Sequence, residues 1–98
     1  GLIEDRSSMR FSVPVDHPAL PGHFPGNPIV PGVVTLDYML NLINFEVPCM
    51  VQSVRFYSTL KGGEPCDVTV VRGQNQITVT CRVGVRKIMT AKLAAAQQ

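Results

Sequence analysis

A histidine and a carboxylic acid stand close together in a stretch that carries few other charges. His23 lies in residues 22–26 (GHFPG), and Asp37 follows fourteen positions later in an apolar run. A histidine and an acid in apolar surroundings are the two parts of a general acid–base pair. Burial raises the pKa of a carboxylic acid and lowers that of an imidazole, which brings both closer to neutral pH. The pair therefore predicts proton transfer to and from a bound ligand.

Three further groups extend this candidate site. Asn41 follows Asp37 by four residues, one helical turn on and on the same face, so its amide could hold Asp37 or a water between them. Gly32 and Val33 open the predicted helix, where amide hydrogens lack intrahelical acceptors and can receive negative charge on an oxygen. Base, acid, orienting amide and oxyanion donors fit proton abstraction beside a carbonyl and loss of a leaving group one carbon further on.

Spacing alone leaves structural alternatives open. A histidine in a loop rich in proline and glycine, such as His23, is commonly a hydrogen-bonded structural residue, and we interpret His17 as a structural loop residue. An aspartate on a helix can simply pair with an arginine such as Arg55 or Arg86.

The segment that carries His23 is predicted to be a rigid loop. Residues 11–15 alternate as a strand does, and Pro14 marks its edge or end. Six of the eight prolines lie between Pro14 and Pro31, which excludes a helix or a central strand there. The segment is also too apolar for a flexible linker, so we expect it to fold against the core and bury Ala19, Leu20, Phe24, Ile29 and Val30.

The rest of the chain predicts one helix and an antiparallel sheet. Residues 33–45 are apolar nearly all round, as in a buried helix, and Pro48 ends it. Asp37 would then be buried and would need a partner. Strands are expected at residues 50–57, 66–72, 76–83 and 85–94, and the short turns between them favour antiparallel pairing. The pattern indicates a single α+β domain over residues 1–98, with an antiparallel sheet wrapped around one central helix.

Composition and charge exclude several classes of protein. The 98 residues include 45% hydrophobic and 16% charged residues, which supports a packed core and argues against disorder. A net charge of +2 is too weak for a dedicated nucleic-acid binder, although a local basic patch for an acidic partner remains open. No stretch approaches the roughly 18 apolar residues of a membrane span. A domain of this size has a thin stability margin, so self-association would help it.

The cysteine pattern favours a reducing, cytoplasmic setting. Cys49, Cys66 and Cys81 form neither a CxxC pair nor a zinc pattern. An odd count without a framework is typical of buried free thiols, and Cys66 and Cys81 fall in runs predicted to be strands. We expect neither a catalytic cysteine nor a metal.

Residues 22–37, GHFPGNPIVPGVVTLD, closely resemble the active-site segment of the 3-hydroxyacyl-acyl-carrier-protein dehydratases of fatty-acid synthesis, the FabA/FabZ type. The family pattern is G-H-F-P-G-x-P-x-x-P-G, followed after four residues by Glu or Asp, and every fixed position is met. This firm match covers about a fifth of the chain. The remainder, including Arg55-Phe-Tyr and Lys61-Gly-Gly-Glu-Pro, is compatible but less specific.

The resemblance implies a hotdog fold and a dimer whose active sites use residues of both subunits. His23 of one protomer would take the α-proton of a 3-hydroxyacyl thioester, and Asp37 of the other would protonate or hydrogen-bond the departing β-hydroxyl. The Gly32 and Val33 amides would steady the thioester oxygen, and Asn41, where the family usually has Gln, would orient Asp37 or a water. No metal or redox cofactor is implied.

The implied partner is an acyl carrier protein that presents the acyl group on phosphopantetheine, in a homodimer or higher homo-oligomer. The candidate contacts to this acidic partner are Arg55, Lys61, Arg82, Arg86 and Lys87.

Two residues differ from those usual in the family. Asp37 replaces the more general glutamate, a form shared with the branch that also isomerises its product, and Tyr38 stands where the family usually has a small residue. The short chain and His17-Pro-Ala-Leu-Pro21 look like compact dehydratase-like proteins of specialised polyene or lipid pathways. Two alternatives remain, a hotdog acyl thioesterase and a non-catalytic acyl-binding hotdog protein.

Overall fold

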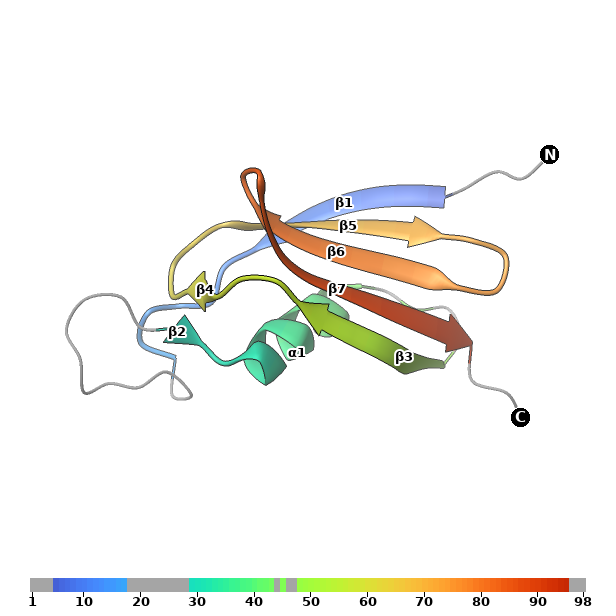
Figure 1. The fold of residues 1–98 in the computed structure, drawn as a ribbon, viewed down its shortest axis with the longest axis horizontal. Helices are drawn as coiled ribbons and strands as arrows, with labels where there is room; N and C mark the ends of the chain where they lie inside the picture. Colours follow the sequence, from blue (N-terminus) through green and yellow to red (C-terminus); the bar gives the residue numbers. More distant parts are fainter. Residues whose placement is uncertain (1–4, 18–28, 44, 46–47, 96–98) are drawn as a thin grey trace.

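The computed structural model describes residues 5–17, 29–43, 45 and 48–95. Within this part of the chain, one helix and seven strands follow one another in the order shown in Figure 1. Their bounds are β1 (Asp5–Phe11), β2 (Ile29–Val30), α1 (Gly32–Leu42), β3 (Cys49–Phe56), β4 (Leu60–Lys61), β5 (Cys66–Arg72), β6 (Ile77–Val83) and β7 (Arg86–Ala95).

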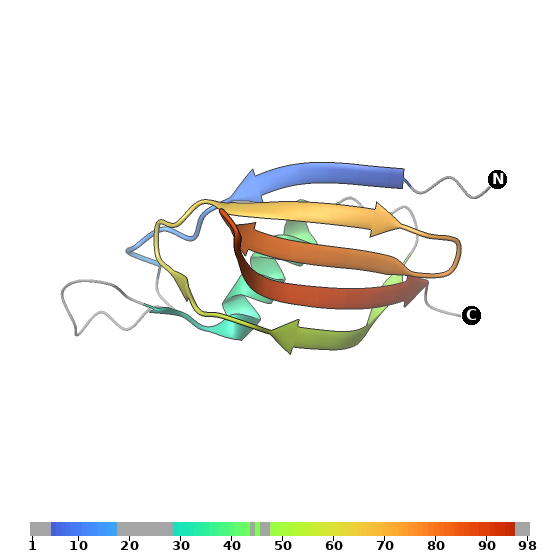
Figure 2. The same cartoon turned by 45° about the horizontal axis from the view of Figure 1, so that its top comes forward.

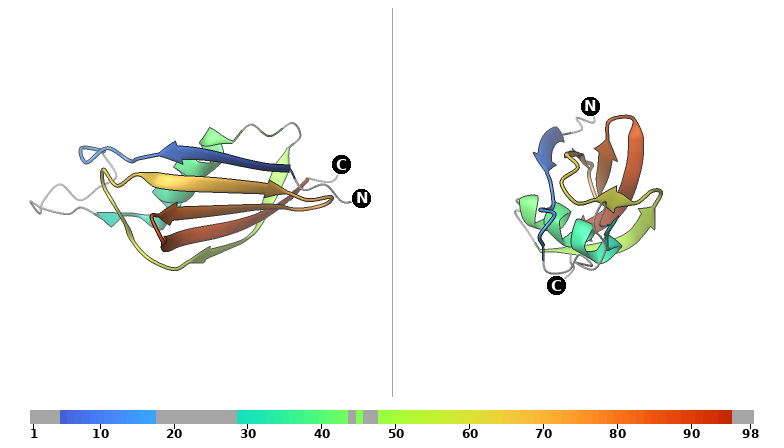
Figure 3. Two further views of the ribbon diagram at one scale, coloured as in Figure 1. Left: turned by 90° about the horizontal axis from the view of Figure 1, so that it is seen from above. Right: turned by 90° about the vertical axis from the view of Figure 1, so that its left-hand side faces the viewer.

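Five of the strands form one antiparallel sheet in the order β1-β5-β6-β7-β3, and β2 pairs with β4 in a separate two-stranded ribbon. The helix lies against one face of the large sheet, and the strands curl around it (Figures 2 and 3). This is the hotdog fold of the α+β class, as the sequence predicted. The opposite face of the sheet carries no helix in the described part of the chain. Strands β1 and β3 are its two edges.

The core lies between the helix and the sheet because alternate residues of each strand point to the same face. The buried side chains of β5 and β7 show this alternation, with Val68 and Val70 on one strand and Met89, Ala91 and Leu93 on the other. From the helix, the side chains buried against them are Thr35 and Met39. The core therefore anchors one face of α1 to the sheet and leaves the other face open.

The predicted burial of the whole helix is wrong for this chain. Val33 is 73% exposed, and Asp37 and Asn41 are also exposed. These three residues stand four apart, so they form one stripe along α1 on the side away from Thr35 and Met39. Asp37 therefore needs no buried partner, and no ion pair to it occurs among the described residues.

The helix also ends earlier than predicted. It stops at Leu42, and Ile43 is extended, with φ of −91° and ψ of 132°. Ile43 is nevertheless only 5% exposed, so it reaches the core from an extended backbone. The apolar run predicted a longer helix because apolar side chains can reach the core from a helical or from an extended backbone. Pro31 lies just before the helix as its N-cap residue.

The strand bounds agree with the prediction in the second half of the chain and differ at its start. Strand β5 matches residues 66–72. Strands β3 and β7 are displaced by one residue at both ends, and β6 begins one residue later than predicted. Residues 11–15 are not the first strand, because β1 ends at Phe11. The β2–β4 ribbon falls where the sequence predicted a loop and a turn. There Val30 is buried as expected, whereas Ile29 is 49% exposed. The predicted burial of Ala19, Leu20 and Phe24 lies outside the described residues.

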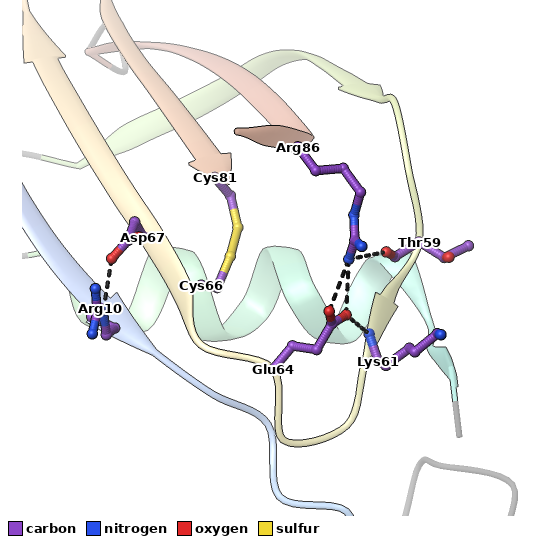
Figure 4. Close-up of a disulfide and its surroundings, with 8 residues drawn as sticks. All are labelled: Arg10, Thr59, Lys61, Glu64, Cys66, Asp67, Cys81 and Arg86. Carbon is purple, nitrogen blue, oxygen red and sulfur yellow. Dashed lines mark hydrogen bonds and ion pairs between the residues drawn. A yellow bond between two sulfur atoms is a disulfide. The ribbon is translucent and has the colours of Figure 1, made fainter. Parts of the chain in front are cut away.

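The turn after β4 is fixed to two neighbouring segments. Gly63 has a φ of 83°, a conformation that L side chains rarely adopt, and its amide donates to the Val13 carbonyl at 2.7 Å. The Glu64 carboxylate accepts hydrogen bonds from the Lys61 amide at 2.8 Å and from the Arg86 guanidinium at 2.9 Å (Figure 4). These contacts tie the ribbon to the start of β7.

The prediction of three buried free thiols is wrong for two of them. Cys66 on β5 and Cys81 on β6 are fully buried and form a disulfide, with their Cα atoms 6.2 Å apart (Figure 4). They lie on neighbouring antiparallel strands with side chains on the same core face, which brings the sulfur atoms together. Cys49 is half-buried and remains a thiol. The prediction of a reducing compartment was based on free thiols, so the disulfide removes its basis.

Candidate active site

Helix α1 presents the predicted acid on its open face. Asp37 and Asn41 line a hollow of about 360 Å³ together with Phe11, Tyr38 and Leu42. The structure thus brings together the acid and the amide that the sequence paired, although no hydrogen bond joins them. His23 lies outside the described residues, so its position relative to Asp37 stays a prediction.

Two aromatic contacts fix one wall of this hollow. The Tyr38 ring stacks on the Phe11 ring of β1, with the ring centroids 5.7 Å apart. The His17 ring meets Tyr38 edge-on at 5.8 Å. Aromatic pairs at such separations are favourable beyond the area they bury. His17 thus packs beside the residue that follows Asp37, and Phe11 and Tyr38 restrict the space around the acid.

The start of α1 opens onto a second, apolar groove. The Val34 and Thr35 amides both donate to the Pro31 carbonyl, at 2.9 and 3.2 Å. The Gly32 and Val33 amides precede these bonds, in the position where a helix offers N–H groups to a ligand. The groove measures about 440 Å³ and is lined by Ile29, Val30, Pro31, Gly32, Val33, Thr35, Phe56, Ser58, Thr59, Leu60 and Ile88.

A close contact shapes this groove beside Gly32. A Cβ atom on Gly32 would lie 2.7 Å from Cε1 and 2.9 Å from Cζ of Phe56. Only a residue without a side chain lets the Phe56 ring of β3 lie against the first turn of the helix. The groove and the acid's hollow share no lining residue. They are nevertheless close, because Val33 and Asp37 lie four residues apart, about 6 Å along the helix.

The five basic residues that were predicted to contact an acyl carrier protein fall into two groups. Arg55, Arg82 and Lys87 lie on β3, β6 and β7, where cross-strand pairing places them on the helix-free face of the sheet. Lys61 and Arg86 lie near the β2–β4 ribbon, and the Arg86 guanidinium is bound by Glu64 and the Thr59 carbonyl. The five candidates therefore do not form one patch.

From the sequence, Phe56 and Tyr57 were named only within a weakly specific segment and not as site residues, although both line recesses of this chain. Phe56 is 52% exposed beside Gly32, and Tyr57 is 47% exposed on the other face of the sheet. The available signal was a pair of aromatic residues at the end of a strand that also carries exposed Met50 and Val51.

The described residues offer neither a metal site nor a membrane-spanning helix. They contain no group of three or more His, Cys, Asp or Glu side chains able to hold a metal ion. Among them, α1 is too short to cross a membrane.

Comparison with known proteins places the chain in a family. Residues 3–92 match the ApeI-like family, described as ApeI dehydratase. A chain of the dehydratase heterocomplex ApeI:P from Xenorhabdus doucetiae has a similar structure, with a TM-score of 0.71 and 17% identity over 99% of each chain. No curated protein shows significant similarity. The family match extends over nine-tenths of the sequence, far beyond the motif at residues 22–37, and the chain therefore belongs to the ApeI-like dehydratase family.

Proposed function

We propose that the protein converts a 3-hydroxyacyl thioester, carried by an acyl carrier protein, into a trans-2-enoyl thioester in a polyene or related lipid pathway. His23 accepts the α-proton, the Cβ–O bond breaks, and Asp37 gives a proton to the departing hydroxyl, which leaves as water. The observation that carries this proposal is the family match over residues 3–92, which includes the histidine and acid at the spacing of the dehydratase motif.

The place of Asp37 supports its role as the acid. It stands on the open stripe of α1, beside a hollow large enough to admit part of a ligand. Asn41 lines the same hollow one turn further on, where its amide can hold the carboxyl group or a water. The Phe11 and Tyr38 rings form an apolar wall there, which limits the access of water to the acid from that side.

The helix start supports a role in binding the thioester oxygen. The Gly32 and Val33 amides face a ligand from the first turn, where the helix dipole adds partial positive charge. The groove at that point is mostly apolar and suits the acyl chain beside the thioester. Negative charge that develops on the carbonyl oxygen would meet these amides about one helical turn from Asp37.

We further propose that two chains associate through β3 to complete the site. This strand is an edge of the sheet, so one side of its backbone is free to pair with another strand. Its exposed apolar side chains are Met50, Val51 and Phe56. A second copy is the proposed partner, although the similar structure comes from a dehydratase heterocomplex.

Turnover of 3-hydroxyacyl thioesters tests the reaction. Purified protein is incubated with the substrate on acyl carrier protein or on coenzyme A, and enoyl absorbance and product mass are followed. His23→Ala and Asp37→Asn should each reduce dehydration by at least about a hundredfold. The matched control is Asp16→Asn, which removes another exposed acid from outside both recesses. Full activity in a folded Asp37→Asn protein would refute the assignment, and release of free thiol would indicate a thioesterase.

A mixing experiment tests whether each site draws on two chains. His23→Ala and Asp37→Asn proteins are inactive alone, but a mixed dimer contains one site with both native residues. Equal mixing with full subunit exchange should restore roughly a quarter of wild-type activity, because half of the dimers are mixed and each has one intact site. Exchange is verified by native mass spectrometry. If mixed dimers form without recovery of activity, the two residues do not act across the interface.

A further inference from the structure

The helix-free face of the sheet carries most of the positive charge of the chain. In antiparallel pairs, residues directly opposite each other share a face. The pairings Arg10–Asp67, Asp67–Arg82 and Arg82–Lys87 run across one end of the sheet, and Arg55–Thr90 and Ser53–Lys92 lie further along it. Six of the nine Lys and Arg residues occupy this face, namely Arg6, Arg10, Arg55, Arg82, Lys87 and Lys92. The net charge of +2 conceals this concentration.

Asp67 is the acid on this face, and it does not neutralise the positive side chains on β3 and β7. Asp67 accepts a hydrogen bond from Arg10 Nε at 2.7 Å (Figure 4). It lies on β5, three strands from β3 in the sheet order, which corresponds to about 14 Å. No salt bridge to Arg55, Lys87 or Lys92 occurs among the side chains that the structure describes.

A hollow of about 320 Å³ lies between β3 and β7 at this end. Its lining consists of Ser53, Val54, Arg55, Tyr57, Thr90 and Lys92. Two of these side chains are cations and three carry hydroxyl groups, while none of the described lining residues is acidic. Arg55 pairs with Thr90 and Lys92 with Ser53, so the two cations are diagonal neighbours with backbones about 7 to 8 Å apart. Without an anion between them, they repel each other.

The Tyr57 hydroxyl group lies among partners that favour negative charge on its oxygen. Hydrogen bonding with the Thr90 side chain lowers the Tyr57 pKa below its ordinary value. Burial opposes this shift, and the charges of Lys87 and Arg55 add to it. The Lys87 ammonium lies 4.9 Å from the centroid of the Tyr57 ring. The surroundings therefore favour negative charge on an oxygen placed here.

We propose that this hollow is a binding site for a phosphate group. A phosphate offers several oxygens to different donors, so it can accept from a guanidinium, an ammonium and hydroxyl groups together. It would relieve the repulsion between Arg55 and Lys92. The site lies on the opposite face of the sheet from α1 and Asp37, so it is separate from the proposed active site and does not depend on dehydration. The phosphate could come from free phosphate or from a phosphate-bearing thiol carrier.

NMR titration of the labelled protein with inorganic phosphate, at constant ionic strength, tests the site. Saturable shifts should centre on Arg55, Tyr57 and Thr90. Arg55→Gln and Lys92→Gln should each weaken phosphate binding about tenfold. The control Arg6→Gln removes the same charge from the same face, at the far edge of the sheet, and should change the affinity less than twofold.

Tyr57→Phe provides a second variant that keeps the ring under Lys87 and removes only the hydroxyl group. It should weaken phosphate binding by about fivefold. Competition by coenzyme A, but not by pantetheine, would assign the site to a phosphate-bearing carrier, whereas no competition by either would assign it to free phosphate. The proposal is overturned if phosphate shifts do not saturate, or if Arg6→Gln weakens binding as much as Arg55→Gln.

Discussion

Replacing Gly32 by alanine probes the contact that shapes the apolar groove. The new Cβ would lie 2.7 Å from Phe56 Cε1, whereas carbon atoms pack at about 3.5 to 4.0 Å. The ring would therefore have to retreat by about 0.8 Å or swing outward. Because Phe56 is already 52% exposed, it can do either without breaking the core.

Two opposing contributions set the change in the free energy of unfolding. Swinging the ring into water exposes about 100 Å² of apolar surface, which costs about 2.5 kcal/mol. Alanine stabilises a helical position by up to about 1 kcal/mol relative to glycine. We expect Gly32→Ala to lower the free energy of unfolding by about 1 to 2 kcal/mol. It should lower turnover as well, because the ring and the new methyl group both stand beside the amides proposed to bind the thioester oxygen.

A double-mutant cycle with Phe56→Ala isolates this contact, with urea unfolding as the assay. In the Phe56→Ala background the clash is absent, so Gly32→Ala should become neutral or stabilising by up to about 1 kcal/mol. Val33→Ala, at a neighbouring position that is 73% exposed, serves as the control and should change stability by less than about 0.5 kcal/mol. Equal destabilisation by Gly32→Ala in both backgrounds would show that the Phe56 contact is not the cause.

Three further variants test the fold. Replacing both Cys66 and Cys81 by alanine opens a link between residues 15 apart in sequence, and should cost about 3 kcal/mol in urea unfolding; mass spectrometry of the alkylated wild-type protein, before and after reduction, checks for the bond itself. The hydrogen bonds from the Lys61 amide and from Arg86 outweigh burial and lower the Glu64 pKa below its usual 4.5. That carboxylate therefore stabilises the fold above about pH 4.5 and ceases to do so as the pH falls through its folded value. Glu64→Gln should then cost about 0.5 to 1 kcal/mol at pH 7, and a difference from wild type that does not shrink in acid would contradict this reasoning. Met39→Ala empties a fully buried position and should cost about 2 to 5 kcal/mol, whereas a loss below 1 kcal/mol would show that α1 is not anchored there.

The sequence predicted the strands best where turn residues bracket them. Strand β5 lies between Pro65 and Gly73, and its predicted bounds agree with the structure. Strand β1 was misplaced because its outward positions include Arg6 and Arg10, so only Met9 and Phe11 contribute apolar alternation. An edge strand with one polar face and few apolar residues gives a weak signal in any sequence.

The disulfide and the exposure of the acid could not be predicted for different reasons. With three cysteines, pairing depends on which strands become neighbours, and only the fold shows that β5 and β6 place Cys66 beside Cys81. The exposure of Asp37 was partly visible, since Asp37 and Asn41 are polar positions four residues apart. It was obscured because the same stripe includes apolar Val33, which suggested burial all round.

The exposed acid and the open sheet edge both indicate that a second chain is needed to cover the site. Proton transfer to and from a bound ligand works best in a site from which bulk water is excluded. Asp37 is exposed in this chain, while β3 offers an unpaired edge with Met50, Val51 and Phe56 exposed along it. If association through β3 supplies the missing cover, turnover per chain must depend on protein concentration.

Dilution tests this dependence directly. Turnover per chain should stay constant while the protein is associated and should fall steeply once dilution separates the chains, because two chains are needed for each site. Sedimentation or light scattering at the same concentrations gives the fraction of associated chains, and the two curves should coincide. Val51→Lys, which places a charge on the exposed edge strand, should shift both curves to higher concentration. Constant turnover at concentrations where only single chains are present would show that one chain covers Asp37 by itself.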